Sequence, residues 1–545
     1  IIVWVVRQKQ NDSADYFLGG RDATWLAIGA SIFASNIGSE HLIGLAGAGA
    51  SSGMAMAHWE IQGWMILILG WVFVPFYTRS MVYTMPEFLE RRYNPQSRTI
   101  LSVISLVSYV LTKVAVTVYA GGLVFQQVFG IKELWGIDFF WIAAIGLVVL
   151  TALYTIFGGM KSVLYTSVLQ TPILLLGSLI ILVLGFKELG GWDEMMRVCG
   201  AVTVNNYGDT MTNLIRSNDD ANFPWLGALI GSAIIGFWYW CTDQFIVQRV
   251  LSGKNEMEAR RGTIFGAYLK LLPVFLFLIP GMIAFALHQK YIGAGGEGFL
   301  PMLANGTANA DAAFPTLVAK LLPAGVKGLV VCGILAALMS SLASLFNSSA
   351  MLFTIDFYKR FRPETPEKKL VGIGQVATVV IVILGILWIP IMRSVGDVLY
   401  TYLQDVQSVL APGIAAAFLL GICWKRTSAQ GGMWGLIAGM VIGLTRLGAK
   451  VYYSNAGEVA DSTFKYLFYD MNWLFFCGWM FLFCIIVVIV VSLATKAPTA
   501  EKIQGLVFGT ATKEQKAATR ASWNHWDIIP VSYTHLRAHE TRHDL

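Results

Sequence analysis

Long apolar runs alternate with short polar segments along most of the chain. The runs predict about a dozen membrane-spanning helices, because one crossing takes roughly 20 apolar residues. They fall near residues 23–50, 54–78, 100–130, 137–157, 162–186, 224–248, 262–287, 315–357, 370–392, 397–423, 430–453 and 472–494. The run at 315–357 is too long for one perpendicular crossing, so it predicts either a strongly tilted helix or one that extends beyond the membrane.

The first run, from Trp25 to Ala50, is interrupted by a polar stretch. The stretch reads Ala34-Ser35-Asn36-Ile37-Gly38-Ser39-Glu40-His41. Gly38 weakens a helix there, and backbone groups freed in a medium without water are tolerated only where they line a cavity or an ion site. The stretch therefore predicts a broken helix, with a polar turn inside an ordinary helix pair as the alternative.

A second interrupted segment begins near Pro224, five spans further along. It carries Gly231 and Gly236, followed by the aromatic cluster Phe237-Trp238-Tyr239-Trp240. Interrupted helices at matching positions of two halves indicate an inverted-repeat secondary transporter with its site near the midplane. We expect an all-α polytopic membrane protein.

Composition excludes a soluble globule. Of 545 residues, 56% are hydrophobic and 13% are charged, and the mean hydropathy is +0.61. The net charge of +6 comes from short loops, so it indicates orientation and gives no reason to expect nucleic acid binding. Basic residues at 79–98, 249–261 and 359–369 predict cytoplasmic loops, which places the connections at 187–223 and 288–314 outside.

Polar side chains inside the apolar runs suggest a binding site. These residues are Asn36, His41, Glu60, Lys270 and Gln404. A charge at the bilayer centre costs about 2.5–3.5 kcal/mol, so such groups face a polar cavity or pair with one another. Their mixed donors and acceptors suit a neutral polyhydroxylated molecule, and Trp238-Tyr239-Trp240 offers ring faces. The alternative is that Glu60 and Lys270 form an ion pair with a purely structural role.

Two hydroxyls lie in another span, in the sequence Ala337-Leu338-Met339-Ser340-Ser341. Serine oxygens together with the carbonyls of a broken helix would form an uncharged oxygen cage for a cation of low charge. Small serines also serve as packing contacts between membrane helices, which is the alternative.

Several longer motifs carry a family resemblance. They are Phe33-Ala34-Ser35-Asn36-Ile37-Gly38-Ser39, Tyr83-Thr84-Met85-Pro86-Glu87-Phe88-Leu89, Trp238-Tyr239-Trp240-Cys241-Thr242-Asp243-Gln244, Ile246-Val247-Gln248-Arg249 and Met339-Ser340-Ser341-Leu342. From about Phe17 to Pro530 the chain closely resembles the sodium/glucose cotransporters of the solute:sodium symporter family. The resemblance implies a five-plus-five inverted-repeat core of the bacterial leucine-transporter type with additional peripheral helices, which couples sodium entry to sugar uptake by alternating access.

The resemblance also implies roles for single residues. The family's sugar contacts match Asn36, His41, Glu60, Lys270 and Gln404, with Tyr239 as an inner gate and Trp240 beside it. The outer hydrophobic gate matches Leu45, Trp59 and Tyr400. The family's sodium site matches the carbonyls of Ala34, Ile37 and Ala337 and the hydroxyls of Ser340 and Ser341.

Three positions depart from the family pattern. Gly236 stands where many sugar carriers place Thr or Asn, which puts hexose specificity in doubt. Members that carry two sodium ions use an Asp and a Thr where this chain has Ser167 and Ala343. We therefore expect one sodium ion per sugar.

The resemblance divides the chain into seven parts. They are the end of a truncated helix with a linker (1–22), the first repeat (23–187), an extracellular loop (188–223), the second repeat (224–423), two peripheral helices (424–500), a cytoplasmic segment leading to a missing last helix (501–530) and a tail resembling translated sequencing adapter (531–545). Histidines 535, 539 and 543 in that tail would otherwise suggest a metal site.

The expected function is sodium-driven symport of a neutral hexose, glucose or galactose, in the plasma (inner) membrane. The expected partners are the sugar, sodium and the lipid bilayer, with no nucleic acid and no obligate protein partner. Alternatives are myo-inositol or another polyol, sialic acid, which the Glu60 carboxylate disfavours, and a sugar sensor that does not transport. We expect no enzyme, since the spans show no nucleophile–base pair.

Overall fold

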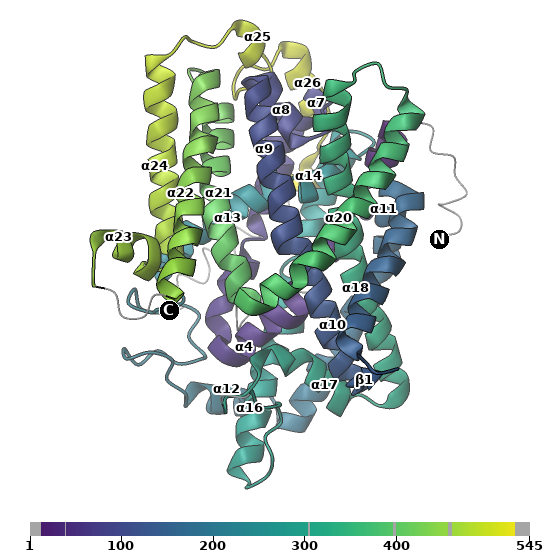
Figure 1. Ribbon diagram of the computed structural model, residues 1–545, viewed down its shortest axis with the longest axis vertical. Helices are drawn as coiled ribbons and strands as arrows, with labels where there is room; N and C mark the ends of the chain where they lie inside the picture. Colours follow the sequence, from purple (N-terminus) through teal and green to yellow (C-terminus); the bar gives the residue numbers. More distant parts are fainter. Residues whose placement is uncertain (1–11, 39, 304–305, 396–398, 456–459, 529–545) are drawn as a thin grey trace.

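The protein is helical over almost all of the part described by the computed structural model, which is residues 12–38, 40–303, 306–395, 399–455 and 460–528. Side chains at 111–112, 391–405 and 455 are not described. Within these residues, nine helices are long and apolar enough to cross a membrane. Figure 1 shows them running mostly along the long axis, with one short antiparallel ribbon formed by β1 (Glu133–Leu134) and β2 (Ile137–Asp138).

The first apolar run is a broken helix, as its polar stretch predicted. α3 (Trp25–Asn36) ends at Ile37, where ψ is 88°, and the chain continues as the π-helical η2 (Glu40–Leu45) and α4 (Ala46–Ser52). Gly38 lies against α18 (Ala324–Met351), where a Cβ would collide with the Ser341 hydroxyl. Glycine is therefore needed at the break for close approach.

The second interruption is confirmed, but the break does not fall at a glycine. The segment comprises α13 (Trp225–Gly236), the π-helical η6 (Phe237–Thr242) and α14 (Gln244–Leu251). Asp243 is extended, with φ −75° and ψ 127°, and its carboxylate accepts from the Phe245 N–H at 3.1 Å as the cap of α14. Gly231 lies inside α13, where a Cβ would be 2.9 Å from the Leu474 carbonyl oxygen.

Two of the expected spans join and one divides. α11 (Phe139–Leu189) covers both runs between 137 and 186, with a kink at Gly159, where φ is +52°. The long run at 315–357 is divided at Pro323 between α17 and α18, but a continuous helix of 38 residues still runs from Ala324 to Phe361, so a long helix is present and only its start differs from the expectation. Proline lacks the N–H of a helix interior and is tolerated where a new helix begins.

The remaining elements of the first half lie partly in the predicted spans and partly in the connections between them. They are α2 (Ser13–Leu18), η1 (Gly19–Arg21), η3 (Gly53–Met56), α5 (Ala57–Ile61), α6 (Trp64–Ile68), η4 (Leu69–Phe73), α7 (Val74–Ser80), α8 (Met85–Arg92), α9 (Pro95–Ser108), η5 (Tyr109–Val114), α10 (Ala115–Phe129) and α12 (Trp192–Gly200). The first of the three short helices η3, α5 and α6 begins at Gly53, whose φ is +76°.

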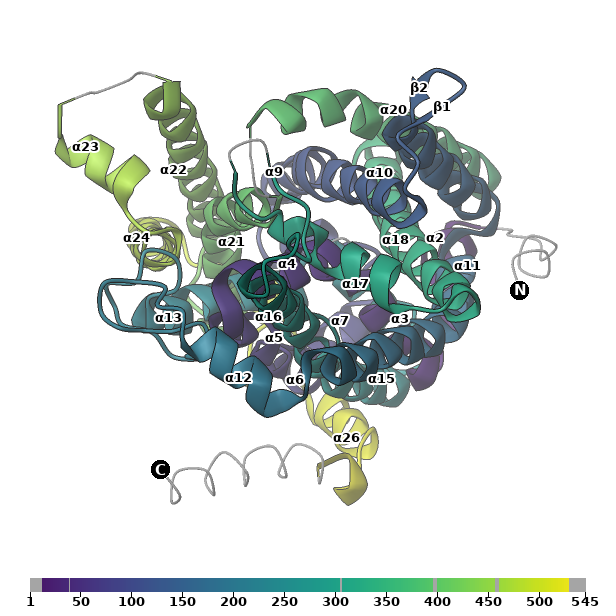
Figure 2. The ribbon, with the colours of Figure 1, turned by 90° about the horizontal axis from the view of Figure 1, so that it is seen from below.

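The second half contains the remaining elements. They are α15 (Glu256–Leu269), η7 (Val274–Leu278), α16 (Ile279–Gly293), η8 (Ala310–Ala312), α17 (Ala313–Leu321), η9 (Leu352–Tyr358), α19 (Lys359–Phe361), α20 (Glu367–Val395), α21 (Leu399–Cys423), α22 (Ala429–Asn455), α23 (Thr463–Lys465), η10 (Tyr466–Asp470), α24 (Trp473–Ala494), α25 (Ala500–Ile503) and α26 (Lys513–Ala521). In Figure 2, α22, α23 and α24 lie at one edge, whereas α4 and α16 lie near the centre.

Several arginines counted as loop charges are buried instead. Arg92 and Arg260 are each 1% exposed, and Arg249 on α14 is fully buried. The Arg92 guanidinium donates to the carbonyl oxygens of Gly421 and Thr427 at 2.6 and 3.1 Å. The first bond satisfies a carbonyl left unpaired in the last turn of α21, and the second satisfies a carbonyl of the connection that follows, so Arg92 caps the end of this helix.

Candidate functional site

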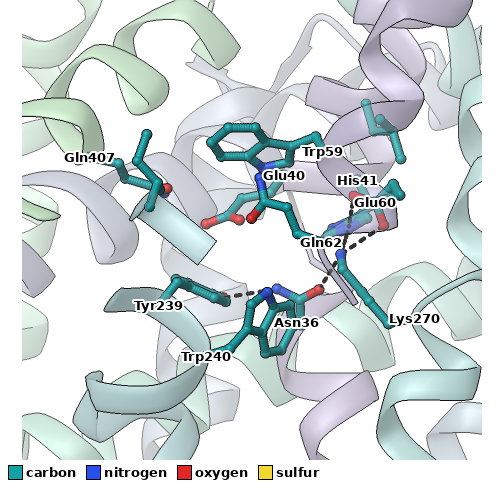
Figure 3. Close-up of a pocket in the computed structure, with 12 residues that line it drawn as sticks. Asn36, Glu40, His41, Trp59, Glu60, Gln62, Tyr239, Trp240, Lys270 and Gln407 are labelled. Carbon is teal, nitrogen blue, oxygen red and sulfur yellow. Dashed lines mark hydrogen bonds and ion pairs between the residues drawn. The ribbon is translucent and has the colours of Figure 1, made fainter. Parts of the chain in front are cut away.

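A pocket lies between the two broken segments, as Figure 3 shows. Its walls come from the first broken helix, α5, the end of α13, η6, Lys270 directly after α15, and α21. The lining residues are Asn36, Glu40, His41, Leu45, Trp59, Glu60, Gln62, Ile235, Tyr239, Trp240, Lys270 and Gln407. Of the seven residues expected to contact substrate, all except Gln404 therefore line the same pocket.

The Lys270 ammonium is the centre of the pocket's polar network. It lies 2.7 Å from Asn36 Oδ1, 2.7 Å from His41 Nε2 and 2.7 Å from Glu60 Oε2. His41 Nε2 is also 3.2 Å from Glu60 Oε1, and Glu60 is only 1% exposed. A buried charge is tolerated when paired and hydrogen-bonded, so these contacts offset the cost of placing Lys270 inside the protein.

Tyr239 closes one side of the network. Its hydroxyl accepts a hydrogen bond from Asn36 Nδ2 at 2.9 Å, and its side chain is buried. The ring packs edge-on against Trp240, with centroids 4.9 Å apart. Tyr239 thus presents an aromatic surface held in place by the broken first helix.

A second buried ion pair lies directly beside Tyr239. Lys113 Nζ is 2.5 Å from Asp243 Oδ2 and 4.5 Å from the centroid of the Tyr239 ring. The Tyr109 hydroxyl donates to the other Asp243 oxygen. No role was predicted for Lys113 from the sequence, although a lysine inside an apolar run was the available signal.

The residues expected at the sodium site gather where α3 meets α18. Ser341 Oγ donates to the Ser35 carbonyl oxygen at 2.8 Å, and Ser340 Oγ lies 3.2 Å from Ser167 Oγ. The three residues expected to contribute carbonyls are buried at 0–1% exposure: Ala34, Ile37 and Ala337. Neutral oxygens are abundant at this junction, which is the chemistry that hard cations of low charge prefer.

Arg249 supports the same junction. Its Nε donates to Ser35 Oγ at 3.1 Å, and Ser35 Oγ lies 2.7 Å from Ser344 Oγ on α18. The prediction that Arg249 is a loop charge was wrong, because its side chain is buried on α14.

The expected outer gate is described only in part. Leu45 and Trp59 line the pocket, and the Trp59 ring meets Trp473 with centroids 5.8 Å apart. The side chains of Tyr400 and Gln404 lie outside the described residues, so their roles remain predictions.

Four residues that line the pocket were not predicted from the sequence. They are Glu40, Gln62, Ile235 and Gln407. Glu40 belongs to the polar stretch that breaks the first helix, and Gln62 follows Glu60 by two residues. Both offered a polar signal within an apolar run, whereas nothing in the sequence distinguishes Ile235 from other apolar residues.

Residues 16–439 match the model of the sodium:solute symporter family. The chain belongs to this family. The symporter is 37% identical to human sodium/myo-inositol cotransporter 2 over 518 residues, which cover 93% of this chain and 76% of the relative. It is 36% identical to the Danio rerio sodium/glucose cotransporter 4 over 536 residues, which cover 95% and 80%.

Solved structures show which fold the symporter has. A Na+-coupled sialic acid symporter superposes with a TM-score of 0.70 at 21% identity, over 91% of this chain and 95% of that one. Mhp1, a nucleobase-cation-symport-1 family transporter, gives a TM-score of 0.50 at 13% identity, over 92% and 99%. The fold is of the five-plus-five inverted-repeat, leucine-transporter type, as the motifs predicted.

The family also establishes the general activity. The chain is a multi-pass membrane protein and a sodium-coupled solute symporter, with sodium as the co-transported ion.

The network around Lys270 predicts a measurable stability effect. Lys270→Met should destabilise the protein by about 3–5 kcal/mol, because it leaves the buried Glu60 carboxylate without its cation. The double variant Lys270→Met/Glu60→Gln should recover most of the loss. Thermal unfolding of the purified symporter in detergent measures both.

Lys290→Met is the matched control, because Lys290 Nζ bonds only the Leu189 carbonyl oxygen, at 3.0 Å, among the contacts described. A double variant as unstable as Lys270→Met alone would contradict the charge explanation.

Proposed function

We propose that this symporter imports a neutral polyhydroxylated ring, a hexose or a cyclic polyol such as myo-inositol. The observation that carries the proposal is the buried network of ammonium, carboxylate, imidazole and amide around Lys270. Its members both donate and accept, as hydroxyl groups do. Because Glu60 and Lys270 offset each other's charge, the network suits a substrate without net charge.

Glucose or galactose is the first candidate, and myo-inositol is the second. The name of the human relative that is 37% identical supports myo-inositol, and that of the fish relative at 36% supports glucose. These identities are too close to favour either substrate. Sialic acid fits less well, because its carboxylate would meet Glu60 and Glu40 in the pocket.

We assign substrate contact to the polar pocket residues and gating to the aromatic ones. The contacts are Asn36, His41, Glu60, Tyr239, Trp240, Lys270 and Gln404, and the gates are Tyr239 inside and Leu45, Trp59 and Tyr400 outside. The assignment is supported by the enclosure of the described members of both sets around one pocket.

Sodium would bind between α3 and α18, at Ala34, Ile37, Ala337, Ser340 and Ser341. Binding there would hold the broken helix against α18 and favour the outward-open state, so coupling would follow from the different sodium affinities of two states. We further propose that residues 23–187 and 224–423 form the two repeats, and that the protein resides in the plasma membrane.

Transport into proteoliposomes tests the proposed function. We expect an inward sodium gradient to drive radiolabelled glucose, galactose or myo-inositol above equilibrium, and a potassium gradient of equal size to have no such effect. Sodium-independent equilibration of all three would contradict the proposal, and binding without accumulation would favour a sensor.

The sodium assignment predicts a selective defect in Ser341→Ala. The sodium concentration for half-maximal uptake should rise about tenfold, or about 1.4 kcal/mol, while the preference among substrates stays unchanged. Uptake measured over a range of sodium concentrations gives both quantities.

Ser349→Ala is the matched control, because Ser349 is also buried on α18 but lies two turns further on. An equal rise in both variants would show that the hydroxyl of Ser341 has no special relation to sodium.

We predict one sodium ion per substrate molecule. Ser167 provides a neutral hydroxyl that donates to the Val163 carbonyl oxygen at 2.6 Å, and Ala343 offers no side-chain oxygen. A second site would therefore lack both a carboxylate and a hydroxyl. Parallel measurement of charge and substrate uptake should give one charge per molecule, and a ratio of two would contradict this expectation.

A further inference from the structure

Gln62 and Gly236 compete for one space in the pocket wall. Gln62 directly follows α5, and Gly236 is the last residue of α13. A Cβ at position 236 would lie 2.7 Å from Gln62 Oε1 and 3.2 Å from Gln62 Cδ. The Gln62 carboxamide therefore occupies the volume that a larger side chain at position 236 would need.

The amide nitrogen of Gln62 has no hydrogen-bond partner among the described residues, although the side chain is only 5% exposed. Burying an amide donor without a partner is unfavourable, so native structures rarely keep one unless a ligand or water satisfies it. Gln62 lines the pocket, and Figure 3 shows it among the polar side chains there. The missing partner is therefore expected inside the pocket.

Several other polar groups in the pocket bind one another, although His41 Nδ1 is, like Gln62 Nε2, buried without a hydrogen-bond partner among the described residues. Lys270 contacts Asn36, His41 and Glu60, and Asn36 also donates to Tyr239. A substrate hydroxyl that approaches these groups must compete with existing bonds. In contrast, the Gln62 Nε2 group can donate to a hydroxyl oxygen without giving up a described bond.

We propose that Gln62 determines substrate specificity by donating a hydrogen bond from Nε2 to one hydroxyl oxygen of the transported ring. The inference rests on the proposed function and deepens it. Gly236 makes the contact possible, because any larger residue there would displace the carboxamide. Discrimination among substrate rings then depends on Gln62, directly after α5, and not on a side chain from α13.

The first test is Gln62→Met, which keeps a similar length and removes both polar groups. We expect KM for the preferred substrate to rise about tenfold, because a buried hydrogen bond to the hydroxyl is lost. The informative readout is a series of analogues that each lack one hydroxyl. One analogue that the unmodified symporter transports poorly should no longer be discriminated by the variant.

Unchanged relative KM values across the analogue series would overturn the inference. Gln375→Met is the matched control, since Gln375 Nε2 donates to the Ile156 carbonyl oxygen at 3.0 Å and the residue is not among those lining the pocket. It should leave the analogue preferences intact. If Gln62→Met is not recovered as a folded protein, Gln62→Glu serves instead, because it keeps the shape and exchanges the donor for an acceptor.

A second test transfers the carboxamide from position 62 to position 236. Gly236→Asn alone should lower uptake, because its side chain displaces the Gln62 carboxamide from its place in the pocket wall. Gln62→Ala/Gly236→Asn should restore uptake with an altered order of preference among hexoses and myo-inositol. A double variant no better than Gly236→Asn alone would show that the two side chains do not compete, and would overturn the inference.

Transport of a neutral polyol and the role of Gln62 are tested by different outcomes. If the unmodified symporter accumulates no neutral polyol, the proposed function fails and the inference fails with it. If it accumulates one but Gln62→Met preserves every preference, only the role of Gln62 is overturned.

Discussion

The break in the first helix at Ile37 and Gly38 is the constraint on which the rest of the site depends. A helix that stops inside an apolar medium leaves backbone groups that must find partners. α18 comes close because Gly38 has no side chain, and Ser341 bonds the Ser35 carbonyl oxygen. The same junction that satisfies the backbone thus concentrates neutral oxygens, and the proposed sodium site rests on them.

Two buried ion pairs fix the arrangement around this break. Lys270 joins the first broken segment to α5 through Asn36, His41 and Glu60, and Lys113–Asp243 lies beside Tyr239 at the second break. Each pair is costly to bury, and a better-packed apolar core would often be as stable. Removing one partner of either pair would leave a buried charge without compensation, so each pair holds the elements that it joins in one arrangement.

Much of the site could be predicted from polar residues inside apolar runs. Asn36, His41, Glu60 and Lys270 were found in this way, and the structure brings them into one pocket. The position of the second break was not predictable from Gly231 and Gly236, because their small size serves contacts with Leu474 and Gln62. Likewise, Arg249 has the sequence signature of a loop charge, yet its side chain turns inward to Ser35.

The sequence by itself determined the membrane class, most of the spans, the first break and the family, because each of these depends on the local run of apolar and polar residues. Only the tertiary structure decided which side chains meet. Lys270 and Asn36 are 234 positions apart, Lys113 and Asp243 are 130 apart, and Gln62 lies against Gly236 in the pocket wall. Such contacts depend on how the helices pack, and the pattern of apolar and polar residues along the chain does not specify that packing.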